Sequence, residues 1–386
     1  MTTVFENPDA DLSGPVTWAF VMGCGRFPHV PSADRPATVA GARAVLGFLV
    51  RHRNDFIAPL RSIRCLISDP AVAPGTDVLG IDLGPHGEDA DAPVDAVRED
   101  LVRNEAREWV DGMRPGDQAF LYMASHGIAN GVDALGLLED VLSRPSAKWS
   151  QSFNVSFTAA GLGTTGIERG WVFLDACQEA LPEALGAVAP LSAVNVINFS
   201  PADLGTAKPT VSLAGSRIGG VAWAPTNGDP PYFTQALLEG LENACVEPLS
   251  GLGWAVTGEK LIYKVASLGK SVIGWPRLQT QQLSFFNESE VALLKVANPT
   301  ISVAVTTEVE VDLATALDVR AECTGHPHLT QHRSPGPEMT WRFRVAADKQ
   351  HVYHATAEFA AGLPGYEPAE FDAMPPAQTI VLKRTP

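Results

Sequence analysis

Two short apolar runs constrain the fold of this chain more than any other feature. Residues 118–124 (QAFLYMA) and 171–174 (WVFL) are apolar at alternating and at intervening positions, so both faces of each run would be buried. Strands of this kind lie at the centre of a parallel sheet that helices cover on both sides. Further strands are predicted at 17–22, 63–68, 194–199 and 210–214, and helical spacing predicts helices at 39–50, 97–110, 233–241 and 256–265.

The pattern changes in the last quarter of the chain. Apolar residues alternate with other residues at 301–305, 309–313, 341–345 and 379–382, between stretches rich in Gly and Pro. This period of two predicts an antiparallel β domain. The length of 386 residues is sufficient for two domains. We therefore expect an N-terminal tail at 1–16, an α/β domain at 17–286 and a β-rich domain at 287–386.

Charge and composition exclude several classes of protein. The 44 acidic residues outnumber the 28 basic residues, for a net charge of −16, whereas a nucleic-acid-binding surface needs clustered Lys and Arg. The apolar runs are far shorter than the roughly 20 residues that span a bilayer, and residues 1–14 lack the pattern of a signal peptide. Five scattered cysteines indicate a reducing compartment. We expect a cytoplasmic protein with neither nucleic acid nor membrane as a partner.

Chemically reactive residues follow the two apolar runs directly. One run leads into His126 and Gly127, and the other leads into Asp175 and Cys177. Because catalytic groups gather at the carboxyl ends of parallel strands, these residues are expected to meet. A cysteine acts as a nucleophile in its thiolate form, and a neighbouring His can accept the thiol proton. Gly127 lacks a Cβ, so its N–H could approach a substrate oxyanion together with the N–H of Cys177.

With these motifs the chain resembles the caspase-like cysteine peptidases, a group that contains caspases, metacaspases and bacterial relatives. In caspases the His precedes the Cys by about 50 residues, and here Cys177 follows His126 by 51 residues (177 − 126). Residues 115–117 (PGD) and 232–241 (YFTQALLEGL) also resemble family segments, and the similarity spans about 17–285. The resemblance implies a three-layer α/β/α sandwich with a mostly parallel sheet, and a Cys-His dyad of Cys177 and His126.

The residues around the dyad suggest a preference for basic substrates. Caspases have Gln two residues before the Cys, whereas Asp175 resembles the metacaspase and bacterial branch. The resemblance implies that Asp175 lies in the pocket for the residue before the cut bond, where a buried carboxylate selects Arg or Lys. Gly41 stands where some metacaspases have a second pocket acid, and Asp34 is a nearby substitute. Ser125 and Ser216 line this pocket by family position, or are ordinary strand-end serines. Asp175 could instead cap the following helix.

No metal or other cofactor is expected. The Asp cluster by which many metacaspases bind calcium is not recognisable in the sequence. Cys323, His326, His328 and His332 lie close together and could bind zinc. The Gly and Pro residues between and after them favour a plain loop instead.

The sequence therefore predicts a cysteine endopeptidase that cleaves a protein or peptide after Arg or Lys. Its composition suits a bacterial protein, and the resemblance implies a regulated role in stress or antiphage defence, with an activating protein partner. Two alternatives stay open. One is a non-catalytic caspase-fold binding or scaffold module, and the other is a related peptidase with a different residue preference.

Overall fold

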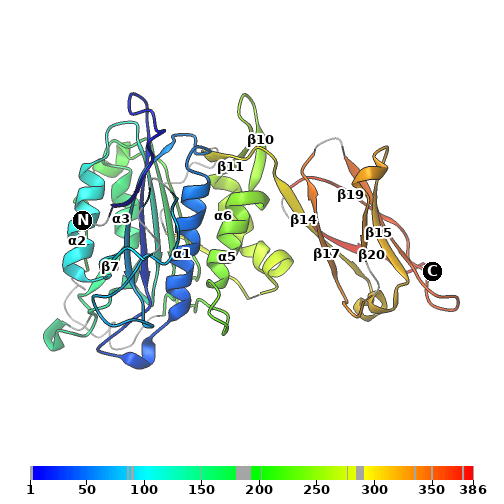
Figure 1. Ribbon diagram of the computed structural model, residues 1–386, viewed down its shortest axis with the longest axis horizontal. Helices are drawn as coiled ribbons and strands as arrows, with labels where there is room; N and C mark the ends of the chain where they lie inside the picture. Colours follow the sequence, from blue (N-terminus) through cyan, green and yellow to red (C-terminus); the bar gives the residue numbers. More distant parts are fainter. Residues whose placement is uncertain are drawn as a thin grey trace.

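The computed structural model describes residues 3–84, 87, 91–147, 149–179, 193–200, 202–275, 277–283, 291–333, 336–348, 351–375 and 378–385. Within these residues a larger α/β part is followed by a smaller β part (Figure 1). No helix among them is long and apolar enough to cross a membrane.

A mostly parallel sheet runs through the α/β part. In the described residues its strand order is β1-β3-β2-β4-β8-β9-β12, and the outermost strands β1 and β12 are antiparallel to their neighbours. The two apolar runs of the sequence are β4 and β8, which lie inside the sheet, as predicted, and pair with each other. The strands are β1 (Thr3–Glu6), β2 (Thr17–Cys24), β3 (Leu60–Ser68), β4 (Gln118–Ala124), β8 (Arg169–Asp175), β9 (Thr210–Ala214) and β12 (Gln281–Gln282).

Helices cover both faces of this sheet, and each face has its own hydrophobic core. Along β4, Phe120 and Tyr122 face the core under α1 (Pro36–Arg51), α5 (Tyr232–Glu239) and α6 (Gly258–Leu268). The intervening Leu121 and Met123 face the core under α2 (Glu99–Asp111) and α3 (Val155–Leu162). Figure 1 shows these two groups of helices on opposite sides of the strands. The alternation of side chains along a strand explains why consecutive residues of β4, from Ala119 to Ala124, are apolar.

Two sequence predictions in this part differ from the structure. The predicted tail at 1–16 contains β1, whose Val4 and Phe5 are buried and which pairs with β3. Its partner lies about sixty positions away, so no local pattern could reveal the pairing. The predicted strand at 194–199 is an irregular segment in which Val194 makes a single bridge to Phe153.

Smaller sheets flank the main one. The first contains β5 (Gly127–Asn130), β6 (Asp133–Leu137) and β7 (Ser152–Asn154), and the second contains β10 (Val246–Leu249), β11 (Gly253–Thr257) and β13 (Ala292–Lys295). The expected domain boundary at 286/287 lies outside the described residues. Beyond it, β13 pairs with β11, and its Leu293 and Leu294 belong to the core of the α/β part.

The C-terminal part consists of two sheets around a third core. One contains β14 (Thr300–Thr307), β17 (Trp341–Ala346) and β20 (Gln378–Leu382); the other contains β15 (Asp318–Cys323), β16 (Gln331–Arg333), β18 (Val352–Glu358) and β19 (Ala369–Asp372). The expected all-antiparallel arrangement needs one correction, because β14 and β20 are parallel. Residues 309–313 alternate in sequence, yet Glu310–Thr315 forms a 3₁₀ helix. Leu313 is buried, while Val311 in this helix and Val309 just before it are exposed.

An ion pair joins the two parts of the chain. Glu239 at the end of α5 is buried, and its Oε2 lies 2.5 Å from Nη2 of Arg344 on β17. The Ser302 hydroxyl of β14 lies 3.4 Å from Oε1 of the same carboxylate. Burial raises the pKa of Glu239, and Arg344 offsets this effect only in part. The carboxylate therefore depends on the C-terminal part for its charge compensation.

We expect Arg344→Ala to lower the free energy of unfolding by about 1–2 kcal/mol near neutral pH, because it leaves the Glu239 carboxylate buried without its cation. The loss is limited because half of the Arg344 side chain is exposed. It should shrink at low pH, where Glu239 is protonated. Urea unfolding near neutral pH and at low pH measures the two free-energy differences. Arg320→Ala, which removes a charge from a surface cluster, is the control. Additive effects of Arg344→Ala and Glu239→Gln would contradict the coupling.

Candidate active site

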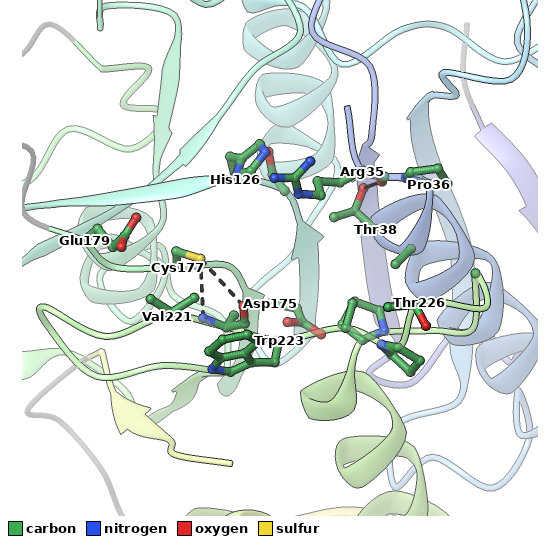
Figure 2. A pocket seen from close by; sticks show the side chains of 17 residues that line it. Arg35, Pro36, Thr38, His126, Asp175, Cys177, Glu179, Val221, Trp223 and Thr226 are labelled. Carbon is green, nitrogen blue, oxygen red and sulfur yellow. Dashed lines mark hydrogen bonds between the residues drawn. The ribbon is translucent and has the colours of Figure 1, made fainter. Parts of the chain in front are cut away.

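Neighbouring strands deliver the two predicted catalytic residues to one place. β4 and β8 pair in parallel with Ala124 opposite Asp175, and the Ser125 N–H continues the pairing with the Asp175 carbonyl. His126 and Cys177 follow directly. Both line a pocket of about 480 Å³ at this end of the sheet, together with residues from 35–38 and 221–231 (Figure 2). The parallel register thus brings together two residues that are far apart in the sequence.

His126 is held by the loop that follows β2. Its Nε2 lies 2.6 Å from the carbonyl oxygen of Ala33, and its ring packs against Phe27 at a centroid distance of 5.1 Å. A carbonyl oxygen only accepts hydrogen bonds, so Nε2 carries the proton and Nδ1 keeps a lone pair in the neutral ring. Burial is the main cause that lowers the pKa of His126, and the Ala33 carbonyl opposes it. The ring is therefore neutral near pH 7 and can act as a base.

Cys177 is a partly buried thiol. Its Sγ accepts a hydrogen bond from the Ala222 N–H at 3.3 Å and lies 3.8 Å from the Ala222 carbonyl oxygen (Figure 2). Burial raises the pKa of the thiol, and the Ala222 N–H lowers it only in part. No hydrogen bond joins Cys177 to His126 within the described part of the chain. The resting pair is therefore a neutral thiol and a neutral imidazole, so attack requires a proton transfer.

Asp175 lines the pocket as a buried carboxyl group. Its Oδ2 accepts hydrogen bonds from the Thr234 N–H at 3.0 Å and the Thr234 hydroxyl at 2.5 Å. That hydroxyl is 2.5 Å from the Tyr122 hydroxyl. Desolvation by burial raises the pKa of Asp175 to about 7 in spite of the two bonds from Thr234. Thr234 lies in the first turn of α5, so Asp175 both faces the pocket and satisfies a free N–H of this helix.

The other predicted residues are only partly brought into the pocket. Ser125 lines it, although its hydroxyl donates to the Leu137 carbonyl. Ser216 is buried, donates to the Ala176 carbonyl and is not among the lining residues. Gly127 is also outside the lining. A Cβ at Gly127 would lie 2.4 Å from the Cys177 carbonyl oxygen, so the close approach of these two segments requires glycine.

Asp34 lies outside the pocket lining, although the sequence offered it as a second pocket acid. Its Oδ1 accepts the Phe27 N–H at 2.7 Å, which directs the carboxylate into its own loop. A Cβ at Gly41, the other position that the sequence analysis considered for a pocket acid, would lie 2.8 Å from the Tyr122 hydroxyl. A larger residue at Gly41 would therefore displace this hydroxyl.

Sequence reasoning missed most of the residues that line the pocket, and three of these carry a charge or a large aromatic ring. Arg35 lines the pocket directly before Pro36, the first residue of α1, and its charge acts on both His126 and Cys177. Glu179 and the half-exposed Trp223 line it as well. Arg35 directly precedes the helix that follows β2, and a charged residue at this position could have been considered for the pocket from the sequence alone. Trp223 lies in a Gly- and Pro-rich loop with no periodicity, so no sequence pattern indicates its place.

The structure also locates the cysteine and histidines considered for zinc. Cys323 is buried, whereas His332 lies 4.0 Å from Asp318. The His326 and His328 rings contact each other edge to face. Over the described ranges, no group of three or more His, Cys, Asp or Glu side chains is arranged to hold a metal ion.

Comparison with known proteins gives distant structural likenesses. No family model and no curated protein sequence matches the chain. A crystal structure of a protein from Geobacter sulfurreducens has a TM-score of 0.40 at 12% identity, covering 73% of this chain and 100% of that chain. Caspase-1 from Spodoptera frugiperda has a TM-score of 0.36 at 12% identity, covering 73% of this chain and 97% of that chain. Since both scores are below 0.5, the function must be inferred from the site itself.

Proposed function

We propose that the chain is a cysteine endopeptidase that cleaves after Arg or Lys, with Cys177 as the nucleophile and His126 as the general base and acid. The observation that supports this most directly is the pair of neighbouring parallel strands, which place Cys177 and His126 in one pocket. The Ala33 carbonyl gives further support, because its hydrogen bond with Nε2–H leaves Nδ1 of His126 unprotonated.

In the proposed reaction, Nδ1 of His126 accepts the thiol proton while Sγ of Cys177 bonds to the peptide carbonyl carbon. The carbonyl π electrons move onto its oxygen, which the N–H groups of Cys177 and Gly127 are proposed to stabilise. When the carbonyl re-forms, the C–N bond breaks and His126 gives its proton to the leaving amine. A water molecule then gives a proton to His126, attacks the thioester and releases the thiolate, which takes the proton back.

The proposed preference for Arg or Lys depends on Asp175. Thr234 occupies Oδ2, and Oδ1 has no hydrogen-bond partner among the residues described. A guanidinium or ammonium group in the pocket would compensate the buried negative charge. Arg35 at the same pocket is positively charged, so a basic side chain would have to lie nearer to Asp175 than to Arg35.

We also propose that the chain is activated by a protein partner. The Ala222 N–H contacts Cys177, and burial keeps the thiol protonated, so the resting site is poorly reactive. A partner that shifts residues 221–226 would expose the sulfur. A role in stress or antiphage defence is part of this proposal on the strength of the sequence resemblance.

Covalent labelling tests the proposed nucleophile. A peptidyl acyloxymethyl ketone that ends in Arg should add once to the chain, at Cys177, because the other four cysteines are buried. Intact mass and peptide mapping locate the adduct, and the Cys177→Ala variant should stay unlabelled. A single adduct on another cysteine, or an equal adduct in Cys177→Ala, would contradict the proposal.

A further inference from the structure

We propose that Asp34 is a positioning residue: its carboxylate forms a hydrogen bond across the loop 25–35 and thereby holds in place the two groups of this loop that contact the His126 ring. The inference rests on the proposed role of His126 as the base. It assigns to Asp34 a function different from the substrate contact that the sequence suggested.

The loop touches His126 at two points that Asp34 ties together. Asp34 Oδ1 accepts the Phe27 N–H at 2.7 Å, which joins the two ends of the segment 27–34. Phe27 packs against the His126 ring, and Ala33, the neighbour of Asp34, provides the carbonyl that accepts the hydrogen bond from Nε2–H. The two residues that contact His126 are therefore Phe27, which bonds to the Asp34 carboxylate, and Ala33, which precedes Asp34. If this closure is lost, both contacts lose their fixed spacing.

Backbone hydrogen bonds support the same closed shape. The Arg35 N–H donates to the Gly25 carbonyl at 2.7 Å, and the Ala33 N–H donates to the Val30 carbonyl at 2.8 Å. The Thr38 side-chain hydroxyl lies 2.8 Å from both the Cys24 and the Arg35 carbonyl oxygens, which share its single proton. These bonds hold the ends of the loop, but none of them involves the Phe27 N–H, whose acceptor is the Asp34 carboxylate. The Asp34 carboxylate is thus the side-chain group that closes the segment.

A buried charge network anchors the other side of the loop. Arg26, next to Phe27, is 5% exposed, and its guanidinium forms two bonds to the Asp77 carboxylate at 2.8 and 3.0 Å and one to Glu139 at 3.0 Å. It also donates to the Asp69 carbonyl at 2.8 Å. Such a bidentate pair fixes orientation as well as position. With Arg26 immobile and the Arg35 N–H held by the Gly25 carbonyl, the bond from the Phe27 N–H to Asp34 fixes the spacing between the Phe27 ring and the Ala33 carbonyl.

Two substitutions separate a closing role from an electrostatic one. Asp34→Asn removes the negative charge but keeps an oxygen that accepts the Phe27 N–H. Asp34→Ala removes both. Arg26 is a poor test, because its loss leaves two buried carboxylates unpaired and endangers folding. Asp11→Ala is the matched control, since Asp11 accepts the Ser13 N–H in an exposed loop that is not part of the pocket.

The first readout is peptide hydrolysis that depends on Cys177. We expect Asp34→Ala to lower kcat by about 10- to 100-fold with little change in KM, because a base displaced by about 1 Å loses this much efficiency. Asp34→Asn should stay within about threefold of the wild type, as should Asp11→Ala. An unchanged kcat in Asp34→Ala, or an equal loss in Asp34→Asn, would overturn the proposal.

The second readout does not need activity. ¹⁵N NMR of the histidine rings, with His126→Gln for assignment, should show the Nε2–H tautomer of His126 in the wild type and in Asp34→Asn, and both tautomers in Asp34→Ala. Equal tautomer populations in all three proteins would overturn the proposal. If the isolated wild type shows no Cys177-dependent hydrolysis, because its partner is absent or because it is not a peptidase, this measurement still decides the role of Asp34.

Discussion

The Cys177→Ala variant should lose the hydrolysis of peptides that end in Arg or Lys by about 10⁴-fold or more, because no other group can form the covalent intermediate. His126→Gln should lose about 10²–10⁴-fold, since the raised pKa of the Cys177 thiol then leaves it protonated without a base. Initial rates on matched fluorogenic peptides ending in Arg, Lys or Asp provide the measurement. Both variants should remain folded, because each removes a side chain at the pocket and not in a core.

Cys65→Ala is the control for this experiment. Cys65 is buried in β3, where burial raises the pKa of its thiol, and it belongs to the core under α1. Its replacement should leave hydrolysis unchanged. Cysteine-dependent cleavage after Asp would preserve the peptidase and refute the assignment of Asp175 as the specificity group. Hydrolysis that survives in Cys177→Ala would refute the nucleophile.

The second large effect concerns Asp175. For a peptide ending in Arg, kcat/KM should rise as the pH increases through about 7, because Asp175 must lose its proton to pair with the guanidinium. The pKa of His126 is lowered, so its titration falls at more acidic pH. Asp175→Asn should reduce kcat/KM for Arg peptides by about 10²–10³-fold and move the acidic limb of the profile to lower pH. A peptide ending in Gln, which needs no negative charge, is the comparison substrate. An unchanged limb in Asp175→Asn would show that another group titrates there.

The same carboxyl group makes stability depend on pH. Burial raises the pKa of Asp175 from 3.8 to about 7, so the folded protein binds this proton more tightly than the unfolded chain does. The contribution is favourable at low pH and is lost as the pH rises through about 7. Asp175→Asn has no proton to lose, so its stability relative to the wild type should increase by about 2–3 kcal/mol between about pH 5 and pH 8. Urea unfolding across this range measures the difference, and parallel curves would contradict it.

Much of the fold could be predicted because the decisive patterns are local. β4 and β8 are apolar on both faces, which predicts central strands regardless of what covers them. The amphipathic spacing of α1 and α2 likewise carries its own signal. Pairings across long stretches of chain were missed, as with β1 on β3 and β20 in parallel with β14. Such partners depend on which edges remain open once the cores have formed.

For the candidate site, too, local sequence patterns predicted some features and tertiary contacts decided the others. The sequence alone determined that His126 and Cys177 follow strands of one sheet, because residue type and strand pattern are sufficient for that. Tertiary structure decided what each side chain touches. The Asp34 carboxylate binds the Phe27 N–H instead of facing the pocket, and Arg35 takes a place in the lining that Asp34 was expected to fill. The direction of a side chain in a loop depends on how the loop closes against distant segments, and a linear pattern does not contain that information.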